Sequence, residues 1–147
     1  MADIGLNPPF SSNLHSRTCV MKDALAQFGS IVVNSGSDYH AAAATTASAG
    51  ATGIIGVVQS QGDPNNSGLF AINDEVTVRD LGDAQVLVLG GTQYARGNLI
   101  LTSTTAGVGK KRLSETTCDV LGYCLQDITT GTNPQLISVR LDPFRIA

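Results

Sequence analysis

The sequence predicts an all-β fold: a small β-sandwich or barrel of about seven to nine short, mainly antiparallel strands with an extended N-terminal arm. Three observations lead to this prediction. Short runs rich in Val, Ile and Leu recur after residue 30, turn-forming residues separate them at short spacing, and the 147 residues are enough for one ordinary domain.

Seven segments have the composition of strands. Apolar and polar residues alternate in 75–80 and 136–142, which is typical of strands with one face in water. Segments 85–89 and 98–102 are apolar on both faces, so we expect them in the middle of the sheet or against another subunit. The full set is 30–34, 53–59, 75–80, 85–89, 98–102, 120–126 and 136–142.

A Gly-Asp pair separates two of these segments. Gly82 and Asp83 lie between 75–80 and 85–89, and they suit a tight two-residue hairpin turn of type II′. The two strands are therefore predicted to pair antiparallel.

Two strand segments share a pattern. Gly56 and Gly122 each follow an apolar pair, and each segment then ends in a Gln and a turn cluster. A glycine inside a strand marks a bulge, a bend or a close backbone approach. The two glycines are therefore either equivalent corners of one barrel or sandwich, or a coincidence in a Gly-rich chain.

The remaining stretches do not have the composition of strands. Residues 20–29 are predicted to form a short helix that ends at a glycine, because their Ala, Leu and Gln are good helix formers. Residues 40–53 have small side chains and are expected to form a surface connector. We predict an N-terminal arm with this helix over 1–29, extended over its first 19 residues, and a single β domain over 30–147.

The chain carries little charge. Charged residues make up 14% of it, against about 25% in ordinary soluble proteins, and the net charge is −3. Such a surface suits a protein that neighbours cover, and the negative charge argues against nucleic-acid binding. Lys110, Lys111 and Arg112 form a small basic cluster, but Thr104 stands where a phosphate-binding loop needs its first glycine. We predict a solvated hairpin arm there, able to meet an acidic partner surface.

The sequence contains no catalytic pattern. His15 and His40 have no neighbouring Ser, Cys or carboxylate that would make a triad or a metal site. Cys19, Cys118 and Cys124 match no zinc or redox motif and are expected to be buried free thiols. We therefore expect no enzymatic activity and no cofactor.

A metal site and a membrane segment are also not expected. Asp63 and Asn65 could contact calcium, but their loop lacks the length and the glutamate of an EF-hand. The N-terminus lacks the layout of a secretory signal, and no apolar run approaches the roughly 20 residues of a membrane helix. We expect the protein to be made in a cytoplasm.

From residue 53 to residue 142 the order of motifs resembles that of phage head decoration proteins, also called capsid cement proteins. A Gly-Val-Val strand, a Val-x-Val hairpin, a Gly-initiated strand, a strand with an internal glycine and a closing alternating strand follow one another. Asn73 and Asp74 depart from the pattern, since the family often has a glycine ahead of the hairpin. The last three motifs contain Gly97, Leu99 and Ile100, then Gly122 to Leu125, then Ile137, Val139 and Leu141.

The resemblance implies a structural virion protein on the capsid exterior, assembled in the host cytoplasm. Such proteins commonly form trimers at local threefold positions and clamp neighbouring subunits of the major capsid protein. The expected partners are therefore the major capsid protein and further copies of this chain, without direct nucleic-acid or membrane contact. We expect the arm to lie on a neighbouring subunit and the trimer contacts to bury part of 85–89 or 98–102. The candidate interface residues are Pro8, Pro9, Phe10, Leu14, Val86, Val88, Leu99 and Leu101.

Two other functions are compatible with the sequence. A receptor- or glycan-binding β module of a phage tail could have the same strand pattern. A small hydrolase could assemble its acids from distant loops, with Asp63, Asp83 or Asp127 as candidates.

Overall fold

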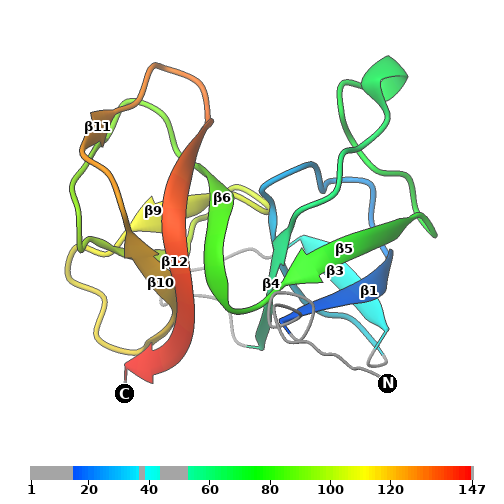
Figure 1. Ribbon diagram of the computed structural model, residues 1–147, viewed down its shortest axis with the longest axis horizontal. Helices are drawn as coiled ribbons and strands as arrows, with labels where there is room; N and C mark the ends of the chain where they lie inside the picture. The colour runs from blue at the N-terminus through cyan, green and yellow to red at the C-terminus, as the bar shows by residue number, and fades with distance from the viewer. Residues whose placement is uncertain (1–14, 37–38, 44–52, 147) are drawn as a thin grey trace, which may run out of the picture.

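The computed structural model of the chain describes residues 15–36, 39–43 and 53–146. These residues form twelve strands and one short 3-10 helix, and they contain no α-helix, which confirms the all-β prediction. The elements are β1 (Ser16–Met21), β2 (Ile31–Asn34), β3 (His40–Ala43), β4 (Ile54–Val58), η2 (Pro64–Asn66), β5 (Glu75–Arg79), β6 (Gly82–Val88), β7 (Gln93–Tyr94), β8 (Leu99–Thr102), β9 (Gly109–Lys111), β10 (Cys118–Cys124), β11 (Ile128–Thr129) and β12 (Gln135–Ile146) (Figure 1).

Strands β1 to β5 close into a five-stranded barrel, on the right in Figure 1. Its order is β1-β3-β2-β4-β5, and β5 pairs back onto β1. The pairing of β1 with β3 is parallel and the other four pairings are antiparallel.

A second five-stranded barrel follows in the chain, on the left in Figure 1. Its order is β10-β12-β6-β9-β8. The pairing of β6 with β9 is parallel and the other four are antiparallel. Strands β7 and β11 form a separate two-stranded sheet.

The two barrels are repeats of one topology. In chain order, β1 to β5 correspond to β6, β8, β9, β10 and β12. Each strand pairing in one barrel then has its counterpart in the other, and the parallel pairing of β1 with β3 corresponds to that of β6 with β9. The register agrees as well. Arg79 in β5 lies opposite the residue that follows Gly56 in β4, and Arg140 in β12 lies opposite the residue that follows Gly122 in β10. The two arginines therefore hold equivalent positions in the two barrels.

The side chains that fill the two barrels also lie at equivalent positions, and all of them are buried. This agreement shows that one pattern of inward-facing residues is used twice. The equivalent pairs are Cys19 with Val86, Met21 with Val88, Val32 with Ile100, Val58 with Cys124, Val76 with Ile137 and Val78 with Val139.

Gly56 and Gly122 are bulge glycines that allow a very close approach between strands. Each lies at a shift of register, in the pairing of β2 with β4 and of β10 with β12. A Cβ at Gly56 would lie 2.2 Å from the carbonyl oxygen of Arg79, and one at Gly122 would lie 2.0 Å from that of Arg140. Any side chain would therefore force the strands apart. The two glycines are equivalent corners, but one lies in each of two barrels rather than both in one.

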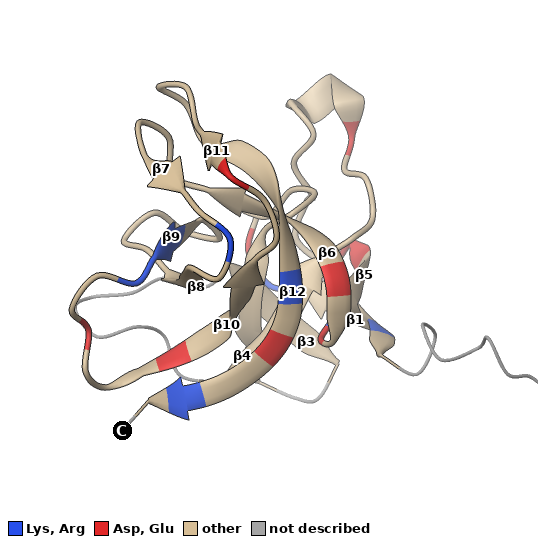
Figure 2. Cartoon of the chain, turned by 60° about the vertical axis from the view of Figure 1, so that its left-hand side comes forward, with Lys and Arg blue, Asp and Glu red and all other residues tan. Residues whose placement is uncertain are grey.

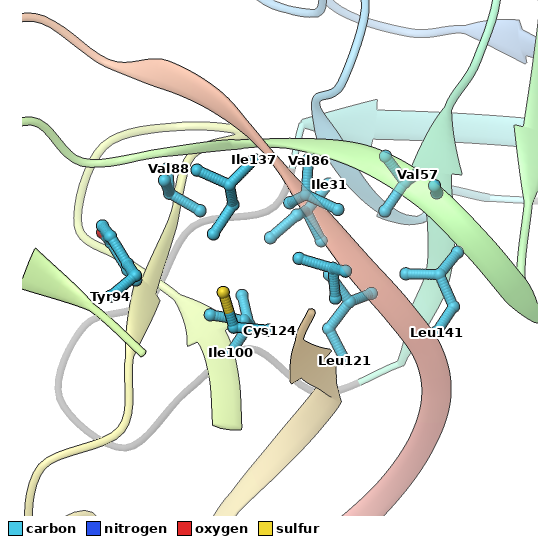
Figure 3. Packing of buried hydrophobic residues seen from close by; sticks show 12 residues of the cluster. Ile31, Val57, Val86, Val88, Tyr94, Ile100, Leu121, Cys124, Ile137 and Leu141 are labelled. Carbon is cyan, nitrogen blue, oxygen red and sulfur yellow. The ribbon is translucent and has the colours of Figure 1, made fainter. Parts of the chain in front are cut away.

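Ile31 and Val57 join the barrels. Both belong to strands of the first barrel, yet they pack with the core residues of the second and have no exposed surface (Figure 3). Gly109 leaves room for this contact, since a Cβ there would lie 3.1 Å from the Cδ1 atom of Ile31. Burial of each such side chain contributes about 1.5–3 kcal/mol. The barrels therefore share a hydrophobic core.

All seven segments predicted as strands are strands. The helix predicted over 20–29 is wrong, the connector predicted over 40–53 is wrong for 40–43, and residues 16–19 of the predicted arm are part of a barrel strand. Residues 16–21 and 40–43 are strands because closing the first barrel requires both of them. In place of the predicted helix, β1 ends in a turn held by Asp23, whose carboxylate accepts the N–H of Leu25 at 3.1 Å and that of Ala43 at 3.0 Å. Residues 44–52 lie outside the described residues.

The predicted hairpin at Gly82 and Asp83 is also wrong. Strand β5 pairs with β1 and β4, whereas β6 pairs with β12 and β9. The Gly-Asp pair begins β6, and the connection leads from one barrel to the next. Gly82 and Asp83 therefore form no hairpin turn, and they belong to a strand that pairs in the second barrel.

The basic cluster at 110–112 is not a solvated arm. Lys110 pairs with Glu115, the Lys111 ammonium donates to the carbonyl of Gln93 at 2.7 Å, and Arg112 Nε donates to the carbonyl of Glu115 at 2.8 Å. The ammonium of Lys110 lowers the pKa of Glu115 to about 2 by donating a hydrogen bond to its carboxylate. The cluster therefore holds the loop after β9 in place.

We predict that Gly122→Ala lowers the free energy of unfolding by about 3 kcal/mol, because the new methyl group would overlap the backbone of β12. The measurement is denaturant unfolding followed by circular dichroism. Gly131→Ala is the control, since a Cβ there would meet no atom within 4 Å, and its effect should stay within about 0.5 kcal/mol. Equal stability of Gly122→Ala and the control would contradict the close approach.

The depressed pKa of Glu115 predicts a contribution to stability that depends on pH. The contribution is complete above the ordinary pKa of 4.5 and is lost as the pH falls through about 2. Other carboxylates titrate in the same range, so the quantity to measure is the difference in unfolding free energy between the wild type and Glu115→Gln. We expect that difference to be largest above pH 4.5 and to shrink towards pH 2. A difference that does not change with pH would contradict the ion pair.

Candidate functional site

The repeat brings polar side chains together where the two barrels meet. Only Asp80 and Leu81 separate the end of β5 from the start of β6. The Leu87 N–H donates to the carbonyl of Gly29 at 2.8 Å, and so connects β6 with the first barrel. The name seam is used below for the region where β5 leads into β6, together with β12, which pairs with β6.

An open pocket of about 480 Å³ lies at the seam. Six of its nine lining residues have charged or polar side chains. Figure 2 shows opposite charges on the neighbouring strands β6 and β12 at this place. The polar residues that line this seam pocket are His15, Arg79, Asp83, Tyr123, Arg140 and Asp142.

Arg79 and Arg140, the equivalent arginines of the two barrels, meet at the seam pocket. Arg140 lies opposite Asp83 in the pairing of β12 with β6 and forms an ion pair with it. The hydrogen bond to the Asp83 carboxylate raises the pKa of Arg140. Arg79 donates from Nη1 to the main-chain carbonyl of Asp83 at 2.7 Å. Asp83 is therefore the common partner of both arginines.

Two polar atoms at the seam are buried without a hydrogen-bond partner, Nε of Arg79 and Oδ1 of Asp80. A buried donor without a partner has lost water and gained nothing in return, which typically costs about 1–3 kcal/mol. Unsatisfied groups of this kind are uncommon and often accompany a functional site.

The structure places the predicted interface residues in three different environments. Pro8, Pro9, Phe10 and Leu14 lie outside the described residues. Val86, Val88 and Leu101 have no exposed surface, because they fill apolar clusters of the chain itself. Leu99 is half-buried. In the folded chain, segments 85–89 and 98–102 therefore have little apolar surface left for a subunit contact.

The other residues considered as candidate sites have structural positions. Cys19, Cys118 and Cys124 are buried and free, as predicted, and burial raises the pKa of Cys19. Asp63 caps η2 by accepting the N–H of Asn65 at 2.9 Å. Asp127 accepts the N–H of Arg96 at 2.9 Å.

His15 borders the seam pocket, and His40 begins β3. Among the described residues, no three His, Cys, Asp or Glu side chains are grouped so that they could hold a metal ion. The described part of the chain also has no helix that could span a membrane.

Sequence reasoning did not find the seam pocket. The sequence predicts Arg79 only as part of a strand with one face in water, and Asp83 as a turn residue and a candidate acid of a small hydrolase. The glycine pattern shared by 53–59 and 120–126 indicates the repeat, but it does not find these arginines. Arg79 lies 23 residues after Gly56 and Arg140 lies 18 residues after Gly122, so an alignment of the two halves on the glycines pairs Arg79 with Arg145. Only the strand pairing makes Arg79 and Arg140 equivalent.

Comparison with known proteins relates the chain to others by its fold. No protein-family model matches the sequence, and a search of curated proteins finds no match. Among solved structures, the chain is similar to the crystal structure of the N base of head fiber gp8.5 in bacteriophage phi29. The TM-score is 0.51 at 18% sequence identity, and the match covers 86% of this chain and 92% of the other. Most of the tandem-barrel chain therefore has the fold of a phage head fiber base.

Proposed function

We propose that the protein is a structural component of a phage virion that sits on the outside of the head and bridges neighbouring subunits of the major capsid protein, as a homotrimer. The observation that carries this proposal is the shared fold with the base of a phage head fiber over 86% of the chain. The order of strand motifs from 53 to 142, which resembles capsid cement proteins, supports it independently.

A tandem barrel is suited to bridging. A bridging protein must contact two neighbouring subunits and must resist being pulled apart between them. Ile31 and Val57 supply resistance, because separating the barrels would expose both side chains to water. The role is structural in this proposal, without enzymatic activity or a cofactor.

Exposed apolar side chains occur on both barrels and offer contact surface. On the first barrel, Leu25 and Ile72 are 55% and 56% exposed. On the second, Leu113 is 74% exposed, in the loop after β9. Contiguous exposed apolar surface marks contact sites, whereas single exposed apolar side chains are ordinary, so these residues serve as the starting points for mapping a contact. We propose that each barrel contacts one shell subunit through its own exposed apolar side chains.

The first test is a titration of the purified protein onto undecorated heads of its own phage, with the bound copies counted at saturation. We expect a fixed plateau of three copies for each local threefold position, and decorated heads that survive heating or osmotic shock better than bare heads. Binding without a plateau, or no binding, would contradict the proposal. Binding to cell-surface glycans in place of heads would favour a tail module.

The second test removes residues 2–14, which we propose contact a neighbouring shell subunit. The deletion must stop before β1, because Ser16 pairs with Arg79 in the first barrel. We expect the affinity for heads to fall at least about tenfold while the unfolding midpoint stays unchanged. A control chain with residues 2–14 replaced by a Gly-Ser segment of equal length separates the effect of sequence from that of length. Unchanged affinity in the deletion would exclude a clamping role for the arm.

A further inference from the structure

The repeat shows that one arginine at the seam has a carboxylate partner and its equivalent does not. In the second barrel Arg140 lies opposite Asp83 and pairs with it. In the first barrel Arg79 lies opposite Ser16, at the position equivalent to Asp83. Serine has no negative charge, so the arginine of the first barrel lacks the cross-strand carboxylate that its equivalent in the second barrel has.

Arg79 is a half-buried cation without an ion pair. No carboxylate of the described residues lies within 4.0 Å of its guanidinium, whereas Arg96, Arg140 and Arg145 each have one at or within that distance. Its Nη1 is fixed by the carbonyl of Asp83, and its Nε is buried without a partner. Burial of a charge is unfavourable unless an opposite charge or further hydrogen bonds compensate for it. A carboxylate would supply both.

The seam pocket gives a carboxylate access to this arginine. Its volume of about 480 Å³ is large enough for an acidic side chain and a short piece of backbone. His15 and Tyr123 border it beside Arg79 and can donate hydrogen bonds. Of the acids at the seam, Asp83 is engaged with Arg140, and Asp142 is exposed and would repel an incoming anion. Asp80 lies outside the lining, and its buried Oδ1 accepts no hydrogen bond from any donor of the described residues, Arg79 included.

We propose that the seam pocket binds a carboxylate of a protein partner, an Asp or Glu side chain that pairs with Arg79 as Asp83 pairs with Arg140. Guanidinium groups hold carboxylates through parallel charge-assisted hydrogen bonds, which makes the contact strong and directional. The identity of the partner rests on the proposed function: the acidic side chain belongs to the shell subunit beneath the seam.

The binding test is a titration of the full chain with N-acetylglutamate methylamide, followed by heteronuclear NMR. We expect saturable shifts of the amides near Arg79 and Tyr123, and no such shifts with the matching glutamine compound. Arg79→Gln should weaken binding at least about tenfold, the size of one charge-assisted contact. Arg17→Gln is the matched control, because Arg17 is an exposed arginine on the neighbouring strand β1 and lies outside the pocket lining.

Two further variants separate binding from a merely structural role. Ser16→Asp should place a carboxylate opposite Arg79, abolish binding of the glutamate compound and leave the unfolding midpoint unchanged or raised. Asp142→Asn should strengthen binding, because it removes the repelling charge. Tighter binding of inorganic phosphate than of the carboxylate, or equal binding by Arg79→Gln and wild type, would overturn the proposal.

The last experiment measures how tightly the Arg79→Gln and Arg17→Gln variants bind to undecorated heads. We expect the first to bind at least about tenfold more weakly than the wild type and the second to bind equally. If the wild type binds heads and Arg79→Gln binds them as tightly, the carboxylate contact is excluded and the head function stands. If the wild type does not bind heads, the head function fails, and the NMR titration still decides whether the pocket takes a carboxylate.

Discussion

The burial of Ile31 and Val57 in the core of the second barrel is the contact on which the arrangement of the molecule depends. Both side chains point out of the barrel to which their strands belong, and both have no exposed surface only because the other barrel covers them. This contact turns two repeats into one body. It also fixes where β5 meets β6, and therefore where the polar residues of the seam come together.

The seam differs from a symmetric contact between two copies. Equivalent arginines reach it from both barrels, but the residues around them are not equivalent: Asp83 stands in one barrel where Ser16 stands in the other. A repeated scaffold can keep its buried positions apolar, since packing constrains them, while exposed positions diverge more freely. The difference between Ser16 and Asp83 is enough to leave Arg79 without an ion pair while Arg140 has one.

The fold class could be predicted from the sequence because the longer strands are built from Val, Ile and Leu between clear turns. Five strands were missed, β1, β3, β7, β9 and β11. Strand β1 begins with Ser-Arg-Thr, β3 is three alanines after a histidine, β9 is a glycine with two lysines, and β7 and β11 have two residues each. Their place in the sheets comes from pairing with neighbours, which no local pattern reveals. The same reason explains the failure of the predicted hairpin: its two strands pair in different barrels, and Gly82 and Asp83 lie in β6 rather than in a turn. The seam pocket escaped prediction because its residues come from four strands, β5, β6, β10 and β12, and from residues 15 and 81 beside them, and only the pairing of the strands brings them together.

Closure of both five-stranded sheets has a consequence for solubility. A strand at an open edge offers unpaired N–H and C=O groups to other chains, and proteins usually guard such edges with charged side chains. This chain has few charges to spare, at 14% of its residues and a net charge of −3. Each barrel instead leaves its five main strands with a neighbour on both sides. In both barrels topology thus does the work that charged edge residues do elsewhere, and the surface can carry exposed apolar side chains without an open barrel edge beside them.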